Sequence, residues 1–326
     1  MAQKGPGKAH REGISLIELT EMFPDEAAAT AWFESKVWPT GRHCPRCGSC
    51  ETTVAPPSRK MPYWCGACRK GFSVRVGTAM ERSKVPLRKW VFAIYLEMVS
   101  LKGVSSMRLH RDLKVTQKTA WFMLQRIREA WADEMAQFAG PVEADETYIG
   151  GLRKNMSQSK RKALKGTGTG ATGKTIVAGV KDRDTNRVSA GIVPDTSTAT
   201  LTAFVERRTD PEATVYTDEH SAYLGLDRPH EAVNHSAGEY VRDGDIHTQG
   251  IESFWSMFER GFHGTYHKIS PKHLGRYVRQ FAGKHNVREA DTADQMASVV
   301  TGLIGKRLMY RELIADNGLP SGARAG

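Results

Sequence analysis

The chain has 326 residues, with 47 Lys and Arg against 36 Asp and Glu, so its formal charge is +11 at pH 7. Hydrophobic residues make up 40% of the sequence. That share excludes a wholly disordered chain, no apolar run is long enough for an ordinary transmembrane helix, and the polar start predicts no secretory signal. The positive charge favours an anionic partner, with nucleic acid ahead of a membrane surface.

A helical segment is predicted over residues 1–36. Apolar side chains recur from Ile14 to Phe23 and again from Ala27 to Phe33. Between these stretches, Pro24-Asp25-Glu26 is typical of a helix start, because acidic side chains in the first turn interact favourably with the helix dipole. We therefore expect the second stretch to begin a new helix at this point.

Five cysteines lie within residues 44–68, a clustering unlike that of a secreted disulfide framework. Four of them form two C-x2-C pairs separated by 17 residues, 48–64. Each pair makes a tight turn that directs two thiolates to one point, and two such turns complete a closed, structural zinc site. We predict a zinc ribbon over residues 37–82, with β-type pieces such as Phe72–Val76. The predicted Zn²⁺ ligands are Cys44, Cys47, Cys65 and Cys68.

The fifth cysteine leaves an alternative open, because Cys47-Gly-Ser-Cys50 is also a C-x2-C pair. Pro45 favours a turn in the first pair. Cys50 is therefore placed outside the zinc site, and no role is assigned to it.

Residues 83–138 are predicted to form three helices. The first carries apolar side chains at helical spacing from Leu87 to Leu101, and Ser105 and Thr116 are candidate N-caps of the second and third. Two short helices joined by a tight turn form the helix-turn-helix pattern, whose second helix contacts DNA. A plain helical bundle is the alternative. On the DNA-binding interpretation, the outward residues of the third helix are Gln117, Lys118 and either Gln125 or Arg126.

From residue 139 onward, predicted strands alternate with helices. Strands are expected at 141–149, 175–180, 187–193, 213–217 and 232–235, and helices at 198–208, 251–260 and 271–286. Three strands followed by a helix, two strands and further helices are the order of an RNase H-like α/β domain, which we expect over 139–290. Residues 291–326 are expected to add a C-terminal helix and a loose tail.

The segment between the first two of these strands is strongly basic. From Thr147 to Lys181 there are eight Lys or Arg residues and no acid. Gly168–Thr175 matches the P-loop spacing, but no strand is predicted before it and no helix after it, so an NTPase is rejected. We predict instead that this loop contacts the phosphates of a nucleic acid. The predicted contacts are Lys160, Arg161 and Lys162.

Three acidic residues lie at the ends or centres of predicted elements. Asp145 is on the first strand, Asp218 closes the fourth, and Glu252 is in the first turn of a helix. Carboxylates from such positions can converge, and their hard oxygen ligands suit Mg²⁺. Two such ions can activate a nucleophile and stabilise the leaving oxygen of a phosphoryl transfer. Taken singly, each acid is more commonly a surface carboxylate, so residue type alone does not select these three.

Several sequence blocks resemble those of bacterial insertion-sequence transposases of the DDE type that carry an N-terminal zinc ribbon. The three acids lie in the blocks Glu143-Ala-Asp145-Glu-Thr-Tyr-Ile-Gly-Gly151, Tyr216-Thr-Asp218-Glu-His-Ser-Ala-Tyr223 and His247-Thr-Gln-Gly-Ile-Glu252-Ser-Phe-Trp255. The stretch Arg260–Leu274, the cysteine block and Phe23-Pro-Asp-Glu26 are also similar to the family. The resemblance covers most of residues 14–290, in the family's order.

The resemblance implies that Asp145, Asp218 and Glu252 form a catalytic triad that binds two Mg²⁺ ions. Water would hydrolyse a phosphodiester at the element end, and the freed 3′-OH would attack target DNA. The zinc ribbon and the helix-turn-helix would recognise the terminal inverted repeats. The resemblance also implies a homo-oligomer on DNA, a dimer or higher, in the bacterial cytoplasm at the nucleoid.

Two positions depart from the family's pattern. Gln249 stands where Asn is expected, and Glu259 stands where a basic residue is expected. The first departure concerns a polar contact near the site and not the acid itself. Because of the second, contacts to the element ends are expected to be weaker or to shift to Arg260, with Lys268 also near DNA. Glu143 shares a strand face with Asp145 because side chains alternate along a strand, but it lies outside the family's catalytic positions and is expected to be dispensable.

Two rival functions belong to other classes. One is a non-catalytic DNA-binding regulator derived from a transposase, which the three intact acids disfavour. The other is an RNase H-like nuclease acting on an RNA-containing duplex, which the large N-terminal DNA-reading region disfavours. A cleavage assay separates the first rival from an active transposase.

Overall fold

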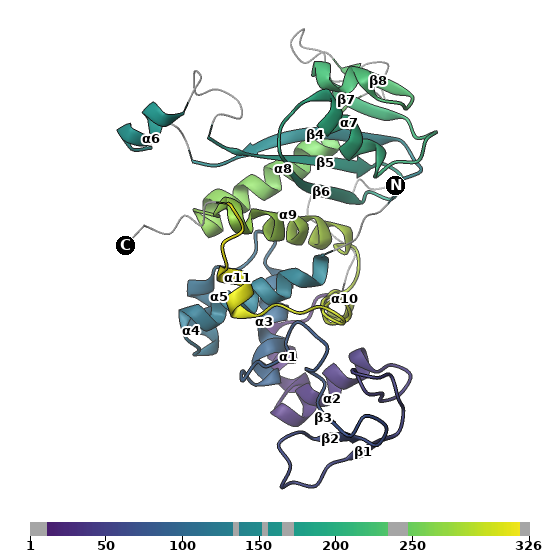
Figure 1. Cartoon of the computed structure of the whole chain (residues 1–326), viewed down its shortest axis with the longest axis vertical. Helices are drawn as coiled ribbons and strands as arrows, with labels where there is room; N and C mark the ends of the chain where they lie inside the picture. Colours follow the sequence, from purple (N-terminus) through teal and green to yellow (C-terminus); the bar gives the residue numbers. More distant parts are fainter. Residues whose placement is uncertain (1–11, 133–136, 152–155, 165–172, 234–246, 320–326) are drawn as a thin grey trace. The chain divides into compact units, whose positions relative to one another are not determined.

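The computed structural model of the chain describes residues 12–132, 137–151, 156–164, 173–233 and 247–319 (Figure 1). The chain folds into two compact units. The first comprises Met1–Ala132 and Val287–Ala315, and the second comprises Asp133–Asn286 and Asp316–Gly326. The chain therefore leaves the first unit, forms the second, and returns to complete the first.

The first unit begins with two capped helices. Ser15 caps α1 (Leu16–Met22) through a reciprocal pair of hydrogen bonds with Glu18. Asp25 caps α2 (Glu26–Val37) by accepting a hydrogen bond of 2.8 Å from the backbone N–H of Ala28. The helix start predicted at Pro24-Asp25-Glu26 is confirmed.

A small antiparallel sheet follows, in the order β1-β2-β3. Its strands are β1 (Thr52–Val54), β2 (Tyr63–Cys65) and β3 (Gly71–Phe72). The expected extended piece beyond Phe72 is wrong, because the chain turns there, with the Val76 N–H donating to the Ser73 carbonyl at 3.0 Å. Val74 and Val76 are nevertheless buried, so their apolar character reflects core packing rather than strand pairing.

Five helices and a 3-10 turn complete the first unit. They are α3 (Leu87–Val99), α4 (Ser106–Leu113), α5 (Gln117–Arg128), the 3-10 turn η1 (Glu129–Trp131), α10 (Thr292–Gly302) and α11 (Tyr310–Ile314). Ser105 and Thr116 accept hydrogen bonds from the backbone at the starts of α4 and α5, so both predicted N-caps are confirmed. Lys114 adopts a left-handed conformation, φ +48°, which makes the turn between them tight. The structure therefore has two short helices joined by a tight turn, as predicted, and their role as a DNA-binding helix-turn-helix stays a prediction.

The second unit contains a five-stranded mixed sheet in the order β6-β5-β4-β7-β8. Its strands are β4 (Val142–Ile149), β5 (Thr175–Asp182), β6 (Val188–Val193), β7 (Val215–Asp218) and β8 (His230–Val233). β4 is antiparallel to β5 and parallel to β7. This order, with three antiparallel strands followed by two parallel ones, confirms the RNase H-like α/β fold.

The two faces of this sheet carry different helices. Val142 and Ala144 of β4 pack in one cluster with α7 (Thr198–Glu206) and the 3-10 turn η3 (Ser221–Gly225). Ile149 of β4 lies in the opposite cluster, with α8 (Gln249–Gly261) and α9 (Pro271–Asn286). Because side chains alternate along a strand, the odd-numbered residues of β4 face α8. This alternation decides which acids of β4 reach the helix.

Besides the 3-10 turns, the structure contains two further local elements that the sequence does not predict. A short helix, α6 (Gln158–Ala163), lies in the basic loop, and α8 continues into a π-helical turn, η5 (Phe262–Tyr266). The helix expected at the C-terminus is present as α10 and α11. Within the described ranges, no helix combines the length and apolar character needed to cross a membrane.

Candidate active site and cysteine cluster

Asp145 lies in the middle of the sheet, on the central strand β4. Its antiparallel partner on β5 is Gly179. The side chain of Asp145 points to the face of the sheet that α8 covers. One carboxylate oxygen accepts a hydrogen bond of 2.8 Å from the backbone N–H of Glu146. The pairing of β4 with β5 and this backbone hydrogen bond therefore fix the position of this carboxylate.

The glycine opposite Asp145 allows α8 to lie close to the sheet. A Cβ atom at Gly179 would lie 2.6 Å from the ring of Trp255 and 3.1 Å from the side chain of Ile251, closer than carbon atoms can approach without displacement. Both residues belong to α8, whose first turn carries Glu252. The absence of a side chain at Gly179 thus brings the helix that carries Glu252 against the strand that carries Asp145.

Glu143 holds the start of α8 in place. Glu143 is 1% exposed. Its carboxylate forms an ion pair with Arg183 at 2.9 Å and accepts a hydrogen bond of 2.8 Å from the backbone N–H of Ile251. Arg183 also donates to the carbonyl of His247, just before the helix. The expectation that Glu143 is dispensable is therefore not supported by its contacts, because a buried charge that fixes the neighbour of Glu252 is part of the framework of the site.

The other two acids of the predicted triad lie at element ends. Asp218 is the last residue of β7 and accepts a hydrogen bond of 3.1 Å from the backbone N–H of His220. Glu252 is solvent-exposed, and its Oε1 accepts a hydrogen bond of 2.8 Å from Thr248 Oγ1 one turn earlier. Each carboxylate is oriented by a local donor.

The electrostatics of Asp145 show that the acids lie close enough to influence one another. Its pKa is raised well above the ordinary value, first because it is buried and then because Glu146, Asp218 and Glu252 place negative charge nearby. The backbone hydrogen bond to Asp145 opposes this shift only in part. The fold thus assembles β4, β7 and α8 into one site of concentrated negative charge.

The donor set of this site suits a hard divalent cation. Carboxylate oxygens are the ligands that Mg²⁺ prefers, and the crowded negative charge of Asp145 is what a cation would neutralise. The acids are spread more widely than the cysteines of the first unit. Among the residues that the structure describes, only those cysteines bring three or more candidate ligand atoms within 4.8 Å of one another.

A fourth acid, Glu146, was not predicted to belong to the site. It accepts a hydrogen bond of 2.8 Å from the hydroxyl of Tyr223 and lies 3.9 Å from His220. Burial and the charge of Asp218 raise its pKa, against the opposing effect of the Tyr223 hydroxyl. Two sequence signals could have indicated this group. Glu146 directly follows Asp145, and His220 and Tyr223 lie in the same block as Asp218.

The cysteine cluster of the first unit has the geometry of a tetrahedral site. Sγ of Cys44 lies 3.7 Å from that of Cys68, and Sγ of Cys47 lies 3.6 Å from that of Cys65. Four thiolates about 2.3 Å from a central Zn²⁺ would be about 3.8 Å apart, so the cluster fits this ion. Cys50 is exposed and lies outside the cluster.

The protein also lowers the pKa of one thiol in this cluster. Burial opposes ionisation of Cys44, but the backbone N–H groups of Arg46 and Cys47 and the thiol of Cys68 outweigh it and lower its pKa to about 7. Gly48 follows Cys47 with φ +74°, a conformation that glycine adopts without strain. The first pair therefore makes the expected turn.

The predicted DNA-contacting residues of α5 divide into two groups. Gln117 and Lys118 are exposed at the start of the helix, as expected. The expectation that Gln125 or Arg126 points outward is wrong, because both are buried. Arg126 donates to the carbonyls of Glu81 and Leu308 at 2.9 and 3.1 Å, and therefore connects parts of the first unit.

The predicted DNA-contacting residues of the second unit are mostly exposed. Arg161 and Lys162 of α6 are exposed, whereas the side chain of Lys160 lies outside the described part of the chain. Arg260 is exposed on α8 and donates to Ser256 at 3.0 Å. Lys268 is exposed after the π-helical turn. Glu259, where a basic residue was expected, accepts a hydrogen bond of 3.3 Å from Thr147.

Comparison with known proteins relates the chain to mobile DNA elements. Residues 137–286 match the family described as ISXO2-like transposase domain, and this range contains all three acids of the predicted triad. The chain is also similar to an uncharacterized protein in transposable element ISH50 of Halobacterium salinarum. The two are 31% identical over 261 residues, which cover 77% of this chain and 87% of the relative.

Proposed function

This chain belongs to the ISXO2-like transposase family, and we propose on that basis that it is an active DNA transposase that cleaves element ends and joins them to target DNA. Asp145, Asp218 and Glu252 are the proposed catalytic residues. The observation that supports this proposal most directly is that the three acids come from the paired strands β4 and β7 and the first turn of α8, all within the matched family range. An acidic cluster around a buried carboxylate is costly to the fold unless it binds a cation.

The three carboxylates have complementary roles in this proposal. Asp145 and Asp218 lie on the paired strands β4 and β7 and would hold divalent cations from the sheet, while Glu252 would approach from the first turn of α8. When bound there, Mg²⁺ supplies Lewis-acid stabilisation of the attacking and leaving oxygens. Water would attack phosphorus and the 3′ oxygen would leave as a hydroxyl. In strand transfer that 3′-OH would attack a target phosphodiester in the same way.

Recognition of the ends is assigned to the first unit. The cysteine cluster would hold one structural Zn²⁺ and fix β1–β3, and the exposed start of α5, with Gln117 and Lys118, would contact the element ends. The basic residues Arg161 and Lys162 of α6 would contact phosphates without reading sequence. Two ends must be brought together for transposition, so we propose that a homo-oligomer assembles on DNA.

The test is a cleavage and strand-transfer assay with Mg²⁺ and the DNA ends that flank the reading frame. Asp145→Asn, Asp218→Asn and Glu252→Gln each keep the side-chain shape and remove the charge, and each should abolish both reactions while leaving end binding nearly intact. Glu219→Gln is the matched control, because Glu219 is exposed beside Asp218. It should keep activity. A wild type that binds the ends but never cleaves them would indicate the regulator instead.

A further inference from the structure

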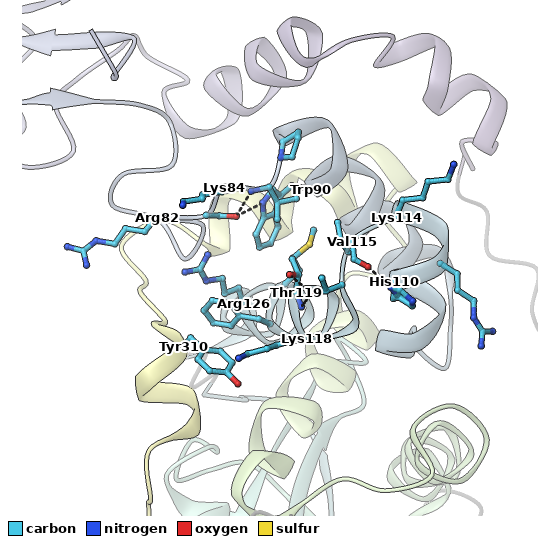
Figure 2. Close-up of a pocket in the computed structure, with 17 residues that line it drawn as sticks. Arg82, Lys84, Trp90, His110, Lys114, Val115, Lys118, Thr119, Arg126 and Tyr310 are labelled. Carbon is cyan, nitrogen blue, oxygen red and sulfur yellow. Dashed lines mark hydrogen bonds between the residues drawn. The ribbon is translucent and has the colours of Figure 1, made fainter.

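The first unit contains a large cavity along one side of α5. Its volume is about 960 Å³, within the range of small-ligand sites. It is lined by the segment before α3, the C-terminal part of α4, one face of α5 and Tyr310 of α11 (Figure 2). It belongs to neither the cysteine cluster nor the acidic site.

The charge of this cavity is of one sign. Six Lys and Arg residues and His110 line it, and none of the described residues lining it is acidic. In Figure 2 Lys118 and Arg126 lie beside Tyr310, whereas the side chains of Arg82 and Lys114 extend away from the other labelled residues. The excess of positive charge favours an anion over a cation. The six are Arg82, Lys84, Arg111, Lys114, Lys118 and Arg126.

Part of the cavity lining is aromatic. Phe122 and Tyr310 contact each other edge to face, with ring centroids 5.5 Å apart. The ammonium of Lys118 lies 4.4 Å from the centre of the Tyr310 ring, and the two side chains lie side by side in Figure 2. Arg126, which donates hydrogen bonds to the carbonyls of Glu81 and Leu308, has its guanidinium carbon 4.1 Å from the centre of the Phe122 ring. An anion that also has a flat apolar part could contact both the basic and the aromatic side chains of the cavity.

An unpaired nucleotide has these two parts. Its phosphate suits the cations, and its base offers a π-face that can stack on an aromatic side chain. In a duplex the π-faces are covered by neighbouring base pairs, so the aromatic part of the lining would remain unused. A free phosphate would likewise make no contact with the rings of Phe122 and Tyr310.

We propose that this cavity binds an unpaired nucleotide of DNA, with its base against Tyr310 and Phe122 and its phosphate near Lys118. The inference rests on the proposed function in that the ligand is DNA. With this site, the first unit would have two functions. It would recognise the element ends, and it would detect DNA ends whose terminal base pairs have opened. Because every base has a π-face, this contact would be tolerant of sequence.

The test compares two DNA duplexes of equal length and equal phosphate number, one fully paired and one with a few terminal mismatches. Binding to the full chain is measured without added Mg²⁺ and without a chelator, so that the DNA stays intact and any Zn²⁺ stays bound. The mismatched duplex should bind about 5- to 150-fold more tightly, the range that stacking of one base on an aromatic side chain provides. Aminopurine at the mismatched end should lose fluorescence on binding.

Variants tie this preference to the cavity. Tyr310→Leu should remove most of the preference and the fluorescence change, whereas Tyr310→Phe should keep both because the ring is retained. Lys102→Ala is the control for an exposed charge of the same unit outside the cavity, and should also keep both. Equal affinity of the wild type for the two duplexes, or an unchanged preference in Tyr310→Leu, would overturn the inference. Cleavage of paired ends with Mg²⁺ is scored separately, so either proposal can fail alone.

Discussion

At the scale of single residues, the second unit concentrates negative charge where water is scarce. Asp145, Glu146, Asp218 and Glu252 come from three elements. Burial, and after it the negative charge of the other three acids, raises the pKa of Asp145 well above its ordinary value of 3.8. The folded protein therefore disfavours the charged form of Asp145. Below pH 3.8 this penalty is absent, it grows as the pH rises through the raised pKa, and it is complete above it.

Removing this charge should stabilise the protein when no divalent cation is present. We expect Asp145→Asn to raise the melting temperature at neutral pH in a buffer without added Mg²⁺. A gain of about 1 kcal/mol corresponds to about 2–4 °C for a unit of this size. Added Mg²⁺ should raise the melting temperature of the wild type, because it binds the folded state, and should have little effect on the variant. A variant less stable than the wild type under both conditions would contradict this account.

Glu143 provides a contrasting case, because its charge is compensated. Glu143→Gln would remove the charge that pairs with Arg183 and weaken the hydrogen bond from the Ile251 N–H, so we expect a loss of about 1–3 kcal/mol. The start of α8 would loosen, and cleavage should fall even though DNA binding is kept. Thermal unfolding and the cleavage assay measure the two effects. Glu212→Gln, at an exposed position of the same unit, should change neither.

For these residues, local sequence patterns predict which side chains share a face but not which distant segments cover them. Strand alternation predicts that Glu143 and Asp145 share a face, but not that α8 lies on that face against Gly179. Helical spacing places Gln117 and Lys118 outward on α5. It fails for Arg126, because the segment that covers Arg126 includes Leu308, 182 residues later in the chain. Contacts between distant segments are invisible to a local pattern.

At the scale of elements, caps and turns were the most predictable features. Asp25, Ser105 and Thr116 each satisfy backbone donors in their own first turn, so the information is local. The strand expected beyond Phe72 fails because β3 has a partner for only two residues. The alternating valines after it are buried by tertiary packing, which produces the same pattern as a strand.

The cysteine cluster links an element to a core. Cys44, Cys65 and Phe72 pack in the same cluster as residues of α2 and α3, so the ribbon and those helices stabilise each other. We expect about one Zn²⁺ per chain by metal analysis, lost in Cys65→Ser together with part of the first unit's thermal transition. Cys50→Ser should keep the metal, because Cys50 lies outside the cluster. Zinc retained in Cys65→Ser would argue against a four-thiolate site.

At the scale of the whole molecule, the order of the chain differs from the order of the folded units. The sequence predicts a linear series of domains, with residues 291–326 as a separate end. In the structure, Val287–Ala315 returns to the first unit, where α10 contacts α2, α3 and η1. The sequence of α10 does not indicate that the helix packs against α2, α3 and η1. An apolar helical face predicts that the helix is buried, but not which element buries it.

This return makes a prediction about dissection of the molecule. Met296, Val299, Val300 and Leu303 are nearly fully buried in the core of the first unit. Burying each apolar side chain contributes about 1.5–3 kcal/mol, so the four together rival the total stability of a typical domain, about 5–15 kcal/mol. A fragment of residues 12–132 should therefore fail to show a cooperative thermal transition.

The same fragment joined by a flexible linker to residues 287–315 should regain this transition, as measured by circular dichroism in the presence of Zn²⁺. Replacing Val299 and Val300 by Asp in the joined fragment should abolish the transition again, because two charges would then be buried without partners. If residues 12–132 unfolded cooperatively alone, the C-terminal helix would be an accessory to the first unit rather than part of its core.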